Sequence, residues 1–275
     1  MKKYNSCLKI AAVVILVAIA WVKVPLSASA QQNEPQAFVL VDCLKIPFEN
    51  EAKYLDFIKS TVVPIQKERI KQGTIVAWFL YKVRFTGAGD NYNYAVVSLF
   101  DNPANIESPM KGLDVGKVFP GKDLNKVLTE ANSLRTIVSS TLLQRQSFVY
   151  PPSGPGNFKY LQIDYMKVPQ GKEGEYYDIE TTVWKPVHNE FIKAGSRVGW
   201  SFWGRVFPAG TGMDFQYITV NYFADWSKIG AADYNSAFAK AHPGKDMNEL
   251  GKRTDASRSL VKSELWEVVE RVAAQ

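Results

Sequence analysis

The sequence predicts an α+β protein made of two consecutive units, each with the order strand, helix, strand, strand, helix, strand. Three observations predict it: the chain repeats itself after 122 residues, the hydrophobic patterns follow one order in both halves, and the Pro- and Gly-rich segment 150–157 separates the halves. With 275 residues, 46% hydrophobic and 22% charged, the chain is long enough for one large core or two smaller ones. This composition excludes a disordered chain and a polytopic membrane protein.

The internal repeat is the strongest of these observations. A shift of 122 residues superposes Asp42, Lys45, Pro47, Tyr54, Asp56, Pro64, Glu68, Ile70, Lys71, Gly73 and Trp78 on Asp164, Lys167, Pro169, Tyr176, Asp178, Pro186, Glu190, Ile192, Lys193, Gly195 and Trp200. One further inserted residue brings 120–123 onto 243–246, both reading Pro-Gly-Lys-Asp. A period of this length matches a complete small domain. We therefore predict domains at 37–150 and 157–272, joined by a linker at 151–156.

Each half begins with a strand and a helix. Residues 38–46 and 158–168 are rich in β-branched and aromatic residues and are followed by proline, which predicts strands. The helix of the second half has an apolar stripe at 3.6-residue spacing, formed by Tyr176, Val183, Trp184, Val187 and Phe191. Gly73 and Gly195 end the two helices. Pro64 and Pro186 lie inside them, and we expect a kink there because proline removes a backbone hydrogen bond.

A hairpin, a second helix and a last strand complete each half. The hairpin strands are predicted at 76–85 and 94–100, and at 198–207 and 215–223. The second helices begin near Asp123 and Asp246, which are positioned to cap them. The last strands are predicted at 142–149 and 265–272. This order is that of a split βαβ, or ferredoxin-like, unit, whose four-stranded antiparallel sheet has both helices on one face.

The second face of each such sheet is bare. Two units can cover each other by pairing their bare faces into a closed or nearly closed barrel, which also protects the sheet edges. The bare faces can be paired within one chain or between two chains, and the sequence does not decide between these arrangements.

The N-terminal segment has the order of a secretory signal peptide. Lys2 and Lys3 precede an apolar run from Ile10 to Val22, and the small residues 28–30 precede a polar stretch. The alternative is an uncleaved anchor, but this run is shorter than the roughly 20 residues that span a bilayer. We expect cleavage after residue 30, export to the periplasm or medium, and no membrane contact afterwards.

Charge and cysteine content exclude several kinds of partner. Four of the 33 basic residues lie in the predicted signal peptide and none of the 27 acidic ones does, so the remaining chain carries a net charge of about +2. This gives no argument for nucleic acid binding. Cys43 is then the single cysteine and forms no internal disulfide. With only His188 and His242, multi-histidine metal sites are excluded, and we expect neither a metal nor a cofactor.

Short patterns resemble the dimeric α+β barrel superfamily. These are residues 184–188 (Trp-Lys-Pro-Val-His), 192–195 (Ile-Lys-Ala-Gly) and 198–200 (Val-Gly-Trp), with a similar frame at 64–78. The resemblance implies the barrel, and the superfamily includes cofactor-free monooxygenases, muconolactone isomerases and haem enzymes similar to chlorite dismutase. In the haem branch a histidine precedes the glycine that ends the first helix of the second half; here this residue is Ala194. Assembly into a homo-oligomer stays open.

Asp42 and Asp164 are charged residues in the middle of apolar strands. Strand alternation places Gln162, Asp164 and Met166 on one face and residues 161, 163 and 165 on the other. If the aliphatic face meets the helices, Asp164 points into the barrel, where burial raises the pKa of a carboxyl and suits it to act as a general acid or base. The alternative is a structural carboxylate satisfied by a neighbouring group.

Further candidates share the face of the second-half sheet that carries Asp164. Tyr217, Thr219 and Asn221 alternate along one strand, and Trp200 lies on its neighbour. An apolar cavity with a few hydroxyl and amide groups is typical of small-molecule pockets. These aromatic side chains are equally explained as core. His188 is a candidate base, haem ligand or half-buried hydrogen-bonding residue.

Together these observations favour an exported protein that binds a small apolar or aromatic molecule without catalysis, since we find no nucleophile, metal or cofactor motif. Its ligand-binding residues would be Asp42, Gln162, Trp200, Tyr217, Thr219 and Asn221. The alternative is a cofactor-independent monooxygenase, isomerase or lyase acting on a small aromatic substrate, with Asp164 or His188 as catalytic base. Haem binding is a third, less favoured interpretation.

Overall fold

The computed structural model describes residues 36–108, 110–121, 123–152, 154 and 156–273. The predicted signal peptide, residues 1–30, lies outside the described residues, and the predicted linker 151–156 lies only partly within them. No helix in the described ranges is long and apolar enough to cross a membrane.

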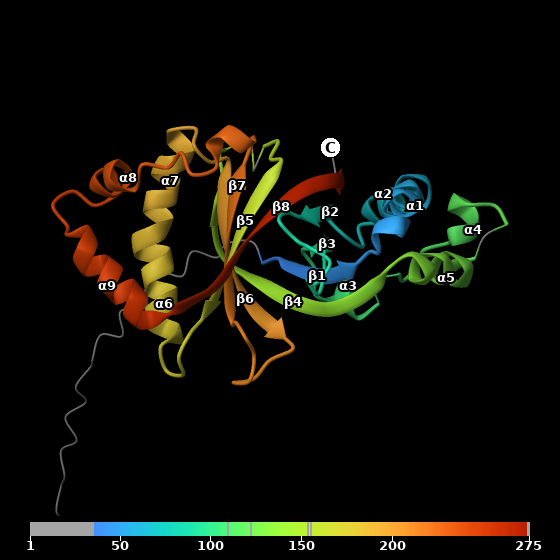
Figure 1. The fold of residues 1–275 in the computed structure, drawn as a ribbon, viewed down its shortest axis with the longest axis horizontal. Coiled ribbons are helices and arrows are strands. Elements are labelled where there is room, and N and C mark those ends of the chain that lie inside the picture. The colour runs from blue at the N-terminus through green and yellow to red at the C-terminus, as the bar shows by residue number, and fades with distance from the viewer. Residues whose placement is uncertain (1–35, 109, 122, 153, 155, 274–275) are drawn as a thin grey trace, which may run out of the picture. The chain divides into compact units, whose positions relative to one another are not determined.

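The described strands form a closed antiparallel barrel (Figure 1). They are β1 (Phe38–Lys45), β2 (Ala77–Val83), β3 (Tyr94–Phe100), β4 (Thr136–Val149), β5 (Tyr160–Lys167), β6 (Gly199–Phe207), β7 (Tyr217–Phe223) and β8 (Ser259–Ala273). Their order around the barrel is β1-β3-β2-β8-β5-β7-β6-β4. The barrel therefore closes within one chain, which decides the question that the sequence leaves open.

Two long strands, β4 and β8, join the halves. β4 pairs with β1 over residues 136–144 and with β6 over residues 142–149. β8 in the same way pairs with β5 over its first part and with β2 over its last part. The predicted strands begin at 142 and 265, six residues later than the observed ones. Residues 136–141 and 259–264 each have only two apolar residues among polar ones, so they show no apolar strand pattern.

Helices lie outside the barrel at both sides (Figure 1). The first half contributes η1 (Phe48–Asn50), α1 (Glu51–Phe57), η2 (Ile58–Val62), α2 (Val63–Lys71), α3 (Ala104–Glu107), α4 (Val115–Val118) and α5 (Leu124–Leu134). The second half contributes α6 (Glu173–Ile179), η3 (Glu180–Trp184), α7 (Lys185–Lys193), η4 (Trp226–Lys228), α8 (Tyr234–Ala241) and α9 (Met247–Ser257). Both predicted caps are confirmed: Asp123 Oδ1 accepts from the Lys126 amide at 2.8 Å, and Asp246 Oδ1 from the Asn248 amide at 2.7 Å.

The prolines inside the first helices follow a wider helical turn. η2 and η3 are π-helical turns, and Pro64 and Pro186 occupy the second position of the α-helices that follow them. Proline has no backbone N–H to donate, and the wider turn changes the backbone hydrogen-bonding pattern at this point. Each helix therefore continues through its proline. Gly73 and Gly195 follow the helix ends with φ values of 68° and 69°, the left-handed conformation that glycine adopts without strain.

Candidate functional site

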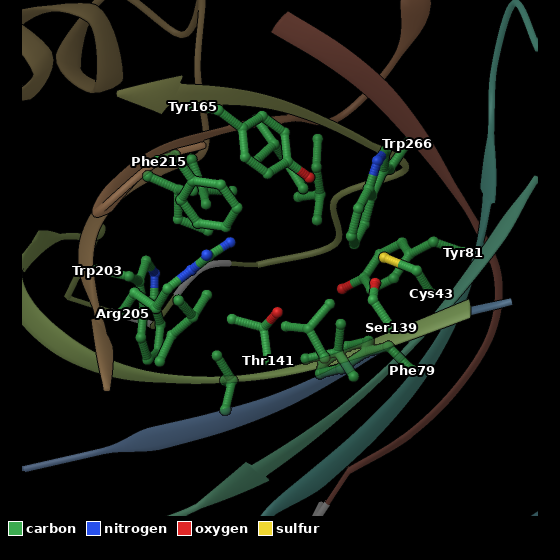
Figure 2. Close-up of a pocket in the computed structure, with 18 of the residues that line it drawn as sticks. Cys43, Phe79, Tyr81, Ser139, Thr141, Tyr165, Trp203, Arg205, Phe215 and Trp266 are labelled. Carbon is green, nitrogen blue, oxygen red and sulfur yellow. The ribbon is translucent and has the colours of Figure 1, made fainter. Parts of the chain in front are cut away.

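The interior of the barrel contains a cavity of about 390 Å³ (Figure 2). This volume falls at the lower end of the roughly 300–1,000 Å³ common for ligand pockets. All eight strands contribute to its wall. The apolar and aromatic lining residues include Val39, Val41, Phe79, Tyr81, Leu99, Leu143, Phe158, Leu161, Ile163, Trp203, Phe215, Ile218, Val220, Tyr222 and Trp266. Such a wall fits a flat aromatic molecule better than a polar one.

Arg205, on β6, is a buried cation of the lining. Its side chain is 8% exposed, and Figure 2 shows it pointing into the cavity. The guanidinium carbon lies 3.5 Å from the centroid of the Phe215 ring, and Nη2 donates to Asp214 Oδ1 at 3.3 Å. Burial lowers the pKa of Arg205, while the nearby Asp214 carboxylate opposes this shift. Arg205 thus brings a positive charge to an otherwise apolar wall.

A carboxylate, Glu264 on β8, anchors several side chains of the wall. It accepts from Tyr92 Oη at 2.5 Å, from Lys262 Nζ at 2.7 Å, from Tyr165 Oη at 3.0 Å and from Trp266 Nε1 at 3.0 Å. All four donors line the cavity. Burial by itself raises the pKa of Glu264, but the hydrogen bonds from Lys262 and Tyr92 outweigh it and leave the pKa below its usual value. Glu264 is therefore ionised at neutral pH.

The hydroxyl and thiol groups near Glu264 are held in their protonated forms. Burial, and next the negative charge of Glu264, raise the pKa of Tyr165 well above its usual value. Burial and the hydrogen bond to Glu264 raise the pKa of Tyr92 in the same direction. Burial raises the pKa of the Cys43 thiol to about 11. The tyrosines are thus hydrogen-bond donors, and Cys43 is a protonated thiol rather than a nucleophile.

The structure reverses the expected orientation of the Asp164 strand. Leu161, Ile163 and Tyr165 line the cavity, whereas Asp164 is absent from its wall. Asp164 accepts from Gln162 Nε2 at 2.9 Å, from Ser263 Oγ at 2.5 Å and from Asn221 Nδ2 at 3.3 Å. The aliphatic face turns inward because water is excluded from a closed barrel, while the helix side admits half-buried polar groups.

His188 and Trp200 meet in the layer between α7 and β6. Their rings stack with centroids 4.7 Å apart and an interplanar angle of 13°. Nδ1 of His188 contacts Nη1 of Arg197. Burial, and then the charge of Arg197, lower the pKa of His188 well below its usual value. His188 is therefore neutral at physiological pH and lies outside the cavity wall.

The remaining predicted residues divide between two places. Tyr217 stacks on Phe202 with ring centroids 5.3 Å apart, and Thr219 is opposite Asp164 in the β5–β7 register. Both belong to the helix-facing side of the second-half sheet. Asp42 lies in the first half, where its Oδ1 accepts from Ser140 Oγ at 2.6 Å and burial raises its pKa. The structure thus gathers the second-half candidates in one layer but separates Asp42 from them.

The sequence patterns did not reveal the cavity-lining residues, nor Glu264, which accepts hydrogen bonds from several of them. Lys262, Glu264 and Trp266 alternate along β8 and pair with Tyr165, Ile163 and Leu161, the inward residues of β5. That alternation was the available signal, but the predicted strand begins only at residue 265. Arg205 lies near the end of an aromatic-rich strand, β6, and its sequence position alone does not distinguish a buried guanidinium from an exposed one.

The layer that contains His188 does not fit a haem group. Trp200 and Phe202 are fully buried there, and Trp200 covers one face of the His188 ring. The Nδ1 atom of His188 already faces the Arg197 guanidinium. Ala194, at the position of the ligand histidine in haem proteins of this type, has no side chain that binds iron. Among the described residues, no group of three His, Cys, Asp or Glu side chains lies close enough to hold a metal ion.

Comparison with known proteins gives matches in structure only. No protein-family model and no curated protein matches the sequence. A candidate monooxygenase from Fusobacterium nucleatum superposes with a TM-score of 0.55 and 11% identity, over 86% of this chain and 94% of the other. An anthrone oxidase-like protein gives a TM-score of 0.52 with 13% identity, over 88% and 94%. A candidate monooxygenase from Lactobacillus acidophilus gives a TM-score of 0.52 with 8% identity, over 87% and 97%.

These matches correct the main functional expectation from the sequence. The similar proteins are described as enzymes, so the interpretation as a binding protein without catalysis is wrong, and the alternative of an enzyme for a small aromatic substrate agrees better with them. At such low sequence identity the structural matches establish the fold alone, and the reaction has to be inferred from the site. The eight-stranded antiparallel barrel and the matches to solved structures show that the chain has the fold of the dimeric α+β barrel proteins.

Proposed function

We propose that this protein is an oxygenase for a small aromatic substrate, and that the reaction takes place in the barrel cavity. The observation that carries the proposal is the cavity wall, where aromatic side chains surround a buried cation, Arg205, and the hydroxyl and ammonium donors held by Glu264. The class of reaction is taken from the descriptions of the similar structures as monooxygenases and as anthrone oxidase-like.

The reaction that best suits such a wall starts from an activated CH₂ group beside an aromatic carbonyl, as in anthrone. Loss of one proton gives an electron-rich anion, which transfers an electron to O₂; recombination then forms a carbon–oxygen bond. The resulting hydroperoxide loses water to give a carbonyl. Overall, CH₂ and O₂ become C=O and H₂O, so that O₂ is the oxidant and the substrate is the only reductant.

In this scheme the residues of the cavity stabilise charge and move the proton. Arg205 and Lys262 lie where they lower the energy of the substrate anion, which develops in an apolar environment that strengthens electrostatic interactions. Tyr165 Oη donates to Glu264 at 3.0 Å. A proton leaving the substrate passes to this oxygen as the proton of Tyr165 passes to Glu264, so that no free tyrosinate forms.

We further propose that the chain arose by tandem duplication of a ferredoxin-like unit and that it acts after export. The strand orders β4-β1-β3-β2 and β8-β5-β7-β6 within the closed barrel support the duplication, together with the 122-residue repeat. The N-terminal pattern of charged, apolar and small residues supports export.

The test is oxygen consumption with anthrone and with a panel of phenols, with heat-denatured protein as the control for spontaneous oxidation. We expect uptake of one O₂ per anthrone, and mass spectrometry should find anthraquinone carrying one oxygen atom from ¹⁸O₂. Tyr165→Phe and Glu264→Gln should each lower kcat about 10²-fold or more. Asp164→Asn should retain turnover, because Asp164 is absent from the cavity wall. Loss of turnover in Asp164→Asn with full turnover in Tyr165→Phe would contradict the proposal.

A further inference from the structure

The charges in the cavity wall are unequal. Of the described residues that line it, Arg145, Arg205 and Lys262 are cationic and only Asp214 is anionic. Lys262 is paired with Glu264 at 2.7 Å. Asp214, the carboxylate nearest Arg205, has a side chain that is 65% exposed, and an exposed partner neutralises a buried cation only weakly because water screens it.

Arg205 also has hydrogen-bonding capacity that the protein leaves unused. Its Nε is buried and has no hydrogen-bond partner among the described residues, although the side chain is only 8% exposed. A buried guanidinium is stable when its donors are matched by acceptors. Nε has no accessible surface, so a ligand does not reach it. The end of the guanidinium points into the cavity (Figure 2), so a ligand there meets its terminal nitrogens.

The neighbouring wall restricts what can carry that acceptor. Phe215 packs on the guanidinium, and Trp203 lies beside Arg205 in the cavity wall (Figure 2). The ring centroids of Tyr165 and Phe215 lie 4.9 Å apart in an edge-to-face arrangement. A charged head group at Arg205 therefore has to be attached directly to a flat apolar body, which fills the remainder of a cavity of about 390 Å³.

From this geometry we propose that the ligand of the cavity is an aromatic anion of two or three fused rings, and that Arg205 binds its ionised oxygen group, a carboxylate or a phenolate. Arg205 is then the residue that determines specificity for anionic over neutral aromatic molecules. The inference rests on the cavity as the site of the proposed function, and it adds the charge of the ligand. It concerns binding alone, so it is tested separately from turnover.

The experiment measures the affinity for a matched pair of probes, 2-naphthoate and 2-naphthamide, which have the same rings and differ in charge. Trp203 and Trp266 line the cavity, so quenching of tryptophan fluorescence reports occupancy. We expect the wild-type protein to bind 2-naphthoate about tenfold or more tightly than 2-naphthamide, since hydrogen bonds to charged groups are the stronger ones. The affinity for 2-naphthol is measured below and above the pKa of 2-naphthol. A phenolate site binds its ionised form more tightly than its neutral form, whereas a carboxylate site binds 2-naphthoate more tightly than either form.

Arg205→Met should lower the affinity for 2-naphthoate about 10- to 100-fold and leave that for 2-naphthamide within about twofold. Arg253→Met, which removes an exposed arginine of α9, is the matched control and should change neither affinity. Should Arg205→Met fail to fold, Arg205→Lys keeps the charge and loses the planar donor set, and it should give an intermediate affinity.

Two results overturn the inference: equal affinities of the wild-type protein for both probes, or an equal loss of both affinities in Arg205→Met. If neither probe binds the wild-type protein, both the inference and the proposed use of the cavity fail. Binding of 2-naphthoate that depends on Arg205, without oxygen uptake from any substrate, leaves the inference standing and contradicts only the proposed reaction.

Discussion

Glu180, the first residue of η3, is only 4% exposed. Ionisation of its buried carboxyl should therefore give the protein a measurable pH dependence of stability. Burial raises the pKa of Glu180 to about 7, against 4.5 as the ordinary value. Tyr176 and the positive charge of Arg258 favour the ionised form, and the negative charge of Asp164 disfavours it. Desolvation outweighs them because the side chain has left water almost completely.

The sign follows from the direction of the shift. Between pH 4.5 and 7 the unfolded chain has already lost the proton that the folded chain retains, so the free energy of unfolding falls as the pH rises. Since one pKa unit corresponds to about 1.4 kcal/mol, the loss amounts to about 3 kcal/mol in total and is complete above pH 7. Glu180→Gln, which keeps the shape of the protonated carboxyl, should remove this loss.

The assay is urea unfolding of the wild-type protein and Glu180→Gln at pH 4.5, 6 and 8. The two should be similar at pH 4.5, and at pH 8 the variant should be more stable by about 3 kcal/mol, or by about 6–12 °C in Tm. Glu49→Gln, at an exposed position, is the control and should show no such divergence. A stability difference between the wild-type protein and Glu180→Gln that is independent of pH would contradict a raised pKa of Glu180, and so would a wild type that becomes more stable relative to the variant as the pH rises.

Three further changes test other parts of the structure. Glu264→Leu leaves Tyr92, Tyr165 and Lys262 without their acceptor and should lower the free energy of unfolding by about 3–5 kcal/mol, measured with urea at pH 7. Because the pKa of Glu264 is lowered, this stability difference should shrink only below about pH 4.5. An unchanged stability at pH 7 would show that the hydrogen bonds to Glu264 do not stabilise the fold. Cys43, with a thiol pKa of about 11, should react with iodoacetamide at pH 8 far more slowly in the folded protein than in urea, as measured by peptide mass spectrometry, and equal rates would contradict its burial. Asp164→Asn should lower Tm, since Ser263 and Gln162 donate to this carboxylate, and an unchanged Tm would argue against a structural role.

The order of the elements was predictable from the sequence because it depends on local patterns. Alternating apolar residues placed β1 and β3, and the aspartates at 123 and 246 marked the starts of α5 and α9. The starts of β4 and β8 were missed, since residues 136–141 and 259–264 gain their pairing from a strand distant in sequence rather than from an apolar pattern of their own.

The site was harder to predict because alternation alone does not say which face of a strand is inside. Along β5, both faces have a regular pattern: one carries Asp164 and the other Ile163. In a sheet with one covered face, the aliphatic side meets the helices; in a closed barrel both sides are covered, and the drier interior takes it. Because the other face of β5 is the inward one, the candidates that share the face of Asp164 lie on the helix side. Glu264 was missed for a separate reason: its contact with Tyr165 is long-range and does not show in a local pattern.

The central claim is that the barrel interior, and not the layer between α7 and β6, is the ligand site. A crystal structure of the protein grown with 2-naphthoate tests it most directly. We expect ring density inside the barrel, with the carboxylate within hydrogen-bonding distance of Arg205 and the rings against the aromatic wall that includes Trp266. Density beside His188 and Trp200, with the barrel interior empty, would contradict it.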